Sequence, residues 1–72
     1  MEFTKDLHVL RYIPKKLQSR VIACDRWQRY EGGYTYNVIF DDDVTSIMAD
    51  SVNGLRWAAA QVAKGRTGLI YG

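Results

Sequence analysis

The chain has 72 residues with a formal net charge of +2, and 47% of its residues are hydrophobic. This length allows one domain with one core, and the apolar share is too high for a disordered tail. Because so short a chain offers little scaffold for a catalytic cleft, we do not expect an enzyme.

Cysteine and histidine each occur once, as Cys24 and His8. A lone cysteine cannot form an internal disulfide, and one Cys with one His cannot complete a structural zinc site. The N-terminus lacks a signal-peptide pattern, and no apolar run approaches the roughly 20 residues that a membrane helix needs. We therefore expect a soluble, cytoplasmic protein that binds no metal or other cofactor and no membrane.

Charge is segregated along the chain. Residues 1–30 hold seven Lys or Arg against three acidic residues, whereas residues 31–50 hold five acidic residues and no base. Residues 51–72 add three further bases and no acid. The small net charge is therefore the balance of opposed patches.

Two strands are predicted in the N-terminal half. Residues 3–13 are rich in strand formers, and Pro14 should end that strand because it donates no ladder hydrogen bond. A polar connection over residues 14–18 leads to a second strand over residues 19–30. Its apolar side chains occupy both parities, which indicates either two buried faces at one end of the strand or a bulge that switches faces near Asp25.

Two hairpins are predicted next. Gly32 and Gly33 supply the positive φ that a tight turn requires, and the alternation over residues 34–40 gives the clearest strand in the chain. An aspartate triplet then closes a second turn, because Asp is depleted in strands and common in turns. A further extended stretch covers residues 44–49.

From Asp50 the apolar period becomes helical, with Asp50 or Ser51 as the cap and Gly65 as the end. Gly54 weakens the first turn, so regular helix is expected only from about that residue. Residues 67–71 predict a short final strand. The apolar stripe of the helix comprises Val52, Leu55, Ala59 and Val62, with Ala58 and Ala63 alongside.

Together these elements predict an α+β fold in a single small domain, residues 1–72. Three or four antiparallel strands form a meander, one helix packs on one face, and a short strand follows at the C-terminus. The path after Pro14 allows either a simple meander or a crossed connection.

The most suggestive cluster of side chains flanks the glycine turn, where aromatic and arginine residues are positioned to form a shared surface across the hairpin. Ordinary cross-strand packing, a protein contact and stacking on nucleic-acid bases all fit this pattern. No RRM, KH or zinc-finger motif accompanies it. The residues are Arg26, Trp27, Arg29, Tyr30, Tyr34 and Tyr36.

Two further features are candidates for partner contact. Asp41, Asp42 and Asp43 lack the spacing of a Ca²⁺-binding EF-hand loop, so they form either a solvated turn or an acidic patch for a basic partner. Trp57 lies on the opposite side of the helix from the centre of the stripe. It therefore faces solvent or, together with Arg56, a partner, unless the stripe is rotated or Trp57 packs under the C-terminal segment.

No catalytic constellation is apparent. Nothing in the sequence brings a serine or Cys24 to His8, as nucleophilic catalysis would require. An exposed or strand-face histidine and a small buried thiol are the simpler interpretations.

These observations favour a non-enzymatic protein-binding module, a small inhibitor or adaptor that docks on a larger protein, alone or as a homodimer. By size and style alone, it is associated with phage or mobile-element proteins that act in host takeover or anti-defence, against a CRISPR effector, nuclease or polymerase. The alternative is a small nucleic-acid-binding module that uses the Arg/Tyr/Trp hairpin. The basic side chains that would contact phosphates in that module are Lys15, Lys16, Arg20, Arg26 and Arg29.

Overall fold

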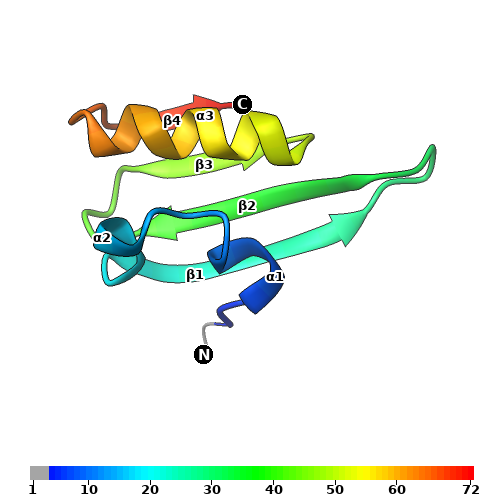
Figure 1. Cartoon of the computed structure of the whole chain (residues 1–72), viewed down its shortest axis with the longest axis horizontal. Helices are drawn as coiled ribbons and strands as arrows, with labels where there is room; N and C mark the ends of the chain where they lie inside the picture. The colour runs from blue at the N-terminus through cyan, green and yellow to red at the C-terminus, as the bar shows by residue number, and fades with distance from the viewer. Residues whose placement is uncertain (1–3) are drawn as a thin grey trace.

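A computed structural model describes residues 4–72 (Figure 1). Two one-turn helices come first, then a hairpin and a third strand, and finally a long helix and a short strand. The elements are α1 (Leu7–Leu10), α2 (Lys15–Gln18), β1 (Val21–Gln28), β2 (Tyr34–Phe40), β3 (Ser46–Ala49), α3 (Val52–Ala63) and β4 (Leu69–Tyr71). None of the helices within these residues is long and apolar enough to cross a membrane.

The four strands form one mixed sheet in the order β1-β2-β3-β4. β2 is antiparallel to β1 and to β3, whereas β4 is parallel to β3. The predicted α+β class and the short C-terminal strand are confirmed. The meander, however, ends at β3, because a strand–helix–strand connection returns the chain to the sheet in the same direction.

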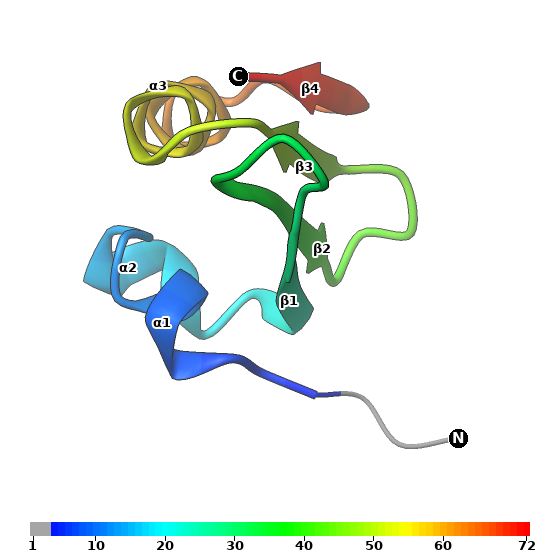
Figure 2. The same cartoon turned by 90° about the vertical axis from the view of Figure 1, so that its right-hand side faces the viewer.

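Within residues 4–72, all three helices lie on one side of the sheet, and no helix or strand covers the other side (Figure 2). The core fills the space between these layers. In α3 the predicted stripe is buried at Leu55, Ala59 and Val62, and Ala58 is buried beside it, whereas Ala63 is exposed. The buried apolar residues of the described part of the chain are Val9, Ile13, Leu17, Val21, Cys24, Tyr36, Val38, Phe40, Ile47, Ala49, Leu55, Ala58, Ala59, Val62 and Ile70.

Residues 3–13 do not form the predicted strand, whose first residue, Phe3, lies outside the described residues. Asp6 instead caps α1, its carboxylate accepting a hydrogen bond of 2.8 Å from the His8 backbone N–H. Val9 and Ile13 are both buried. A four-residue separation would also place two side chains on one face of a strand. The Asp6 cap and the 2.9 Å hydrogen bond from the Leu10 N–H to the Asp6 carbonyl, rather than this spacing, mark the segment as helical.

One fragment of extended pairing remains at the N-terminus. Lys5 forms a parallel bridge with Cys24. The Cys24 N–H donates to the Thr4 carbonyl at 2.9 Å, and the Asp6 N–H donates to the Cys24 carbonyl at 3.0 Å. This short segment therefore covers the middle of the outer edge of β1.

Two further local predictions are corrected. Pro14 precedes α2, in which Leu17 is buried, so residues 14–18 are not a simple polar connection. Proline is compatible with a helix start because its fixed φ and missing N–H cost nothing there. The register of β1 shifts between Val21 and Ala23, nearer the start of the strand than the bulge predicted at Asp25.

Helix α3 begins at Val52, two residues before the predicted start at Gly54. Ser51 caps it, with its hydroxyl oxygen accepting a 3.0 Å hydrogen bond from the Gly54 N–H. Gly54 also lies against the end of β4, where a Cβ on Gly54 would come within 2.4 Å of the Gly72 carbonyl carbon. The glycine that weakens the helix locally is thus required by close backbone packing.

Candidate functional site

The register of the hairpin separates the aromatic residues that flank the glycine turn. Trp27 lies opposite Thr35, whereas Arg26 lies opposite Tyr36. Successive strand residues point to opposite faces, so Trp27 faces the open side of the sheet and Tyr36 faces the helices. Tyr36 is only 7% exposed, and Tyr34 packs against the core beside it. The predicted shared aromatic surface is therefore wrong.

Tyr30, at the hairpin turn, is fully exposed and belongs to neither face. Trp57 is 50% exposed on α3. Its neighbour Arg56 lies 5.5 Å from the centroid of the Tyr12 ring, in a contact between α3 and the segment after α1.

The hairpin arginines are occupied by contacts within the chain. The Arg26 guanidinium lies 4.5 Å from the Tyr34 ring centroid, and its Nε is 3.4 Å from the Asp6 carboxylate. Arg29 approaches Asp50 at 3.3 Å. These partly exposed ion pairs contribute little to stability, but they place a carboxylate beside two of the cations predicted to bind phosphate.

The aspartate triplet forms an organised turn between β2 and β3. The Asp42 carboxylate accepts hydrogen bonds from the backbone N–H groups of Val44 and Thr45 and from the Thr45 hydroxyl. The bond from the Thr45 hydroxyl, followed by those from the backbone, lowers the pKa of Asp42 below its usual value. Arg20 pairs with Asp41 at 3.3 Å and with Asp42 at 3.8 Å.

Cys24 and His8, the two side chains considered for catalysis, lack the features of a nucleophile and its base. Cys24 is buried, as predicted, and its Sγ lies 3.5 Å from the Asp6 carbonyl oxygen. Burial raises the pKa of this thiol, which disfavours the reactive thiolate. His8 is exposed on α1. Within residues 4–72, no group of three or more His, Cys, Asp and Glu side chains is placed to hold a metal ion.

The open face of the sheet is the largest feature that sequence reasoning missed. It carries four large apolar side chains that remain accessible: Trp27 at 48%, Ile39 at 44%, Leu69 at 54% and Tyr71 at 65% exposure. The register places on this face Ala23, Asp25, Trp27, Thr35, Asn37, Ile39, Ser46, Met48, Leu69 and Tyr71.

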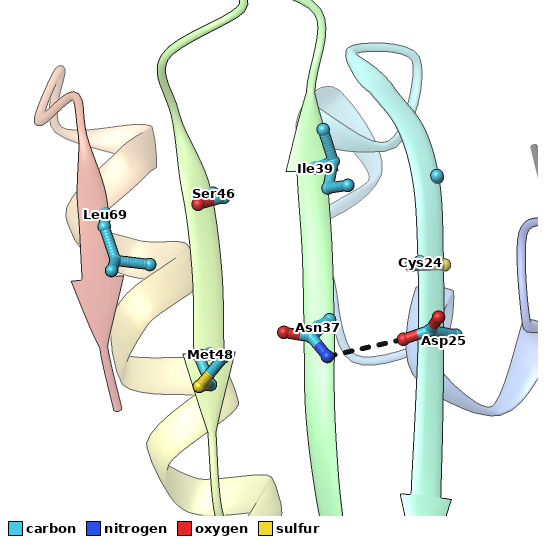
Figure 3. Close-up of a pocket in the computed structure, with 8 residues that line it drawn as sticks. Cys24, Asp25, Asn37, Ile39, Ser46, Met48 and Leu69 are labelled. Atoms are coloured by element: carbon cyan, nitrogen blue, oxygen red, sulfur yellow. Dashed lines mark hydrogen bonds between the residues drawn. The ribbon is translucent and has the colours of Figure 1, made fainter.

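A depression of about 270 Å³ lies in the middle of the open face. Figure 3 shows its side chains on four adjacent strands, with Asn37 donating a 3.5 Å hydrogen bond to the Asp25 carboxylate. Asp25 is the one charged side chain that the strands place on this face, and they place no cation there. The residues that line the depression are Ala23, Cys24, Asp25, Asn37, Ile39, Ser46, Met48 and Leu69.

Alternating parity along each strand was a signal for this face, since Asn37 and Ile39 alternate with the buried Val38 and Phe40. The pairing of four strands was needed to show that the accessible apolar residues share one face of the sheet. In comparisons with known proteins, no family model matches the chain, and neither a curated protein nor a solved structure matches it.

Proposed function

We propose that this chain is a non-enzymatic protein-binding module, an inhibitor or adaptor that docks on a larger protein through the open face of its sheet. One observation carries the proposal: four large apolar side chains stay accessible on a face that no element of residues 4–72 covers. Large apolar side chains gathered on one uncovered face are typical of an interaction site, whereas single apolar residues scattered over a surface are ordinary.

The chemistry of the depression indicates what the partner presents. Its walls at Ile39, Met48 and Leu69 suit an apolar side chain, and Trp27 and Tyr71 on the same face are residue types enriched in binding hot spots. Asp25 at the margin suits a neighbouring Lys or Arg of the partner. A projecting apolar residue next to a base therefore fits this surface.

Charge favours a different protein over a second copy of this chain. Two open faces brought together would place an Asp25 carboxylate from each copy in the interface, and the four strands supply no cation to either face. A carboxylate that loses water without gaining a partner is costly. The same carboxylate disfavours nucleic-acid phosphates at this face.

The test compares charge insertions at matched apolar positions. Ile39→Glu and Leu69→Glu place a charge on the open face, whereas Leu7→Glu does so at a 73% exposed site on α1. Each tagged variant is checked for folding by circular dichroism and then used for quantitative affinity purification from the source cells. We expect the two open-face variants to lose at least about 10-fold of a stoichiometric partner that Leu7→Glu retains, equivalent to about 1.4 kcal/mol of binding.

Equal recovery of the partner by all three variants would place the interface elsewhere. Sedimentation of the purified chain provides a second decision. A dimer that Ile39→Glu dissociates would identify a second copy as the occupant and contradict the proposed partner class. Adding the chain to the recovered partner then separates an inhibitor, which abolishes the partner's activity, from an adaptor, which preserves it.

A further inference from the structure

The helical side of the molecule differs from the sheet in charge. Residues 7–19 and 52–66, which form the helices and their connections, contain six Lys or Arg and no Asp or Glu. Residues 20–50, which form β1 to β3 and their turns, contain three Arg and six acidic residues. Because all three helices lie on one side of the sheet (Figure 2), the cations gather on that side.

The cations of the helical segments, residues 7–19 and 52–66, have no carboxylate partners within residues 4–72. All five ion pairs of this part of the chain involve Arg20, Arg26 or Arg29. The six bases of the helical segments are all exposed and take part in none of these pairs. Their charge is therefore available to a partner. They are Arg11, Lys15, Lys16, Arg56, Lys64 and Arg66.

Tyr12 organises two of these cations. The guanidinium carbons of Arg11 and Arg56 each lie 5.5 Å from the centroid of its ring. Tyr12 is half-buried and packs against the core, which fixes its ring. The guanidinium groups that meet over this ring come from the C-cap of α1 and from α3. Lys15 and Lys16 follow on α2. We call these four cations, Arg11, Lys15, Lys16 and Arg56, the basic patch.

We infer that the basic patch binds the phosphate backbone of a nucleic acid. Clustered, unpaired Lys and Arg on one side of a small domain are the electrostatic footprint of such binding. Each phosphate contact releases condensed counterions, so charge alone supplies affinity without an apolar core. An acidic protein fits less well, because specific protein interfaces need a buried apolar centre and the basic patch consists of long charged side chains.

The residues that would contact the nucleic acid differ from those predicted from the sequence, which centred on the arginines of the hairpin. Arg20, Arg26 and Arg29 each have a carboxylate partner, so the hairpin is poorly suited to phosphate. Lys15 and Lys16 belong to the basic patch. The Tyr12 ring is already engaged by two guanidinium groups, which leaves backbone contact rather than base stacking as the mode of binding.

The experiment is a fluorescence anisotropy titration of the whole chain with a labelled 20-base-pair DNA duplex, the same single strand and the matching RNA. Four phosphate contacts predict a slope near −3.6 for log affinity against log salt, hence a loss of about 100-fold between 50 and 200 mM salt. Arg56→Gln should reduce the slope by about 0.9, and Lys15→Gln with Lys16→Gln by about 1.8. Lys5→Gln is the control, since it removes the same charge at an exposed site outside the helical segments.

Three results would overturn the inference: no binding of any of the three nucleic acids at 50 mM salt, equal effects of Lys5→Gln and Arg56→Gln, or a slope that no variant changes. Polyglutamate is the competing probe. Binding of polyglutamate as tight as that of the duplex, with the same loss in Arg56→Gln, would assign the basic patch to an acidic protein. Leu69→Glu, on the opposite side of the sheet, should leave the duplex titration unchanged. Failure of the proposed nucleic-acid site can therefore be told apart from failure of the proposed protein-binding face.

Discussion

Replacing Gly54 by alanine should fail to stabilise α3, against the ordinary preference of helices. Alanine is favoured over glycine by about 1 kcal/mol in a helix interior. Here the new Cβ would lie 2.4 Å from the Gly72 carbonyl carbon and 2.8 Å from its oxygen. Both contacts are shorter than van der Waals contact, so the backbone at Gly72 must move.

The displacement of Gly72 has a definable cost. Its N–H donates a 3.0 Å hydrogen bond to the Met48 carbonyl, which anchors the end of β4 to β3. Losing that bond costs about 1 kcal/mol, and disturbed packing at the buried Ile70 adds to it. The gain in propensity is offset or exceeded, so we expect Gly54→Ala to destabilise the chain by about 0–2 kcal/mol.

Urea denaturation followed by circular dichroism measures this change, with Asn53→Ala as the control. Asn53 is exposed in the same helical turn, so Asn53→Ala should stabilise the chain by a few tenths of a kcal/mol through helix propensity alone. This is roughly half of the difference in propensity between glycine and alanine. If Gly54→Ala stabilises the chain by about 1 kcal/mol, the close packing of Gly54 on Gly72 is refuted.

Two further predictions concern the faces of the sheet and the β2–β3 turn. Tyr36→Ala should destabilise by about 3 kcal/mol, a large part of the stability of so small a domain, because Tyr36 is 7% exposed in the core. Trp27→Ala on the open face should cost only about 1 kcal/mol in chemical denaturation, and equal costs would contradict the assigned register. Asp42→Asn should lower the melting temperature at pH 7 but much less near pH 2. The pKa of Asp42 is lowered in the folded state, so the carboxylate stabilises the fold at pH values above its unfolded-state pKa. This stabilisation is lost as the pH falls through the folded-state pKa. A difference in melting temperature that is the same at both pH values would refute this role of the carboxylate.

The elements with a strong local signal were predictable. The alternation over β2, the two glycines before it and the Ser51 cap of α3 are features of the sequence itself. The first segment was misassigned because β-branched and aromatic residues favour strands on propensity alone. The Asp6 cap was the available helical signal, and the turn that it begins buries Val9 in the core.

The site depended on pairing that a single sequence does not specify. One residue more or less in the turn at Gly32-Gly33 would bring Trp27 to the same face as Tyr36, because a shift of register by one reverses the faces. The parallel pairing of β4 with β3 was not predicted, although a strand–helix–strand connection favours it. The contact of Arg11 and Arg56 on Tyr12 joins residues 45 apart in the chain and had no local signal.

The short N-terminal segment over the edge of β1 affects how the chain behaves at high concentration. Edge strands expose unpaired backbone groups that recruit strands of other molecules and lead to aggregation. Thr4 and Asp6 satisfy both backbone groups of Cys24, in the middle of the longest strand, and the Asp6 carboxylate reaches Arg26 farther along the same edge. The opposite edge belongs to β4, which has only three residues. One side of the sheet therefore stays accessible to side-chain contacts, while growth of the sheet by added strands is restricted at both edges.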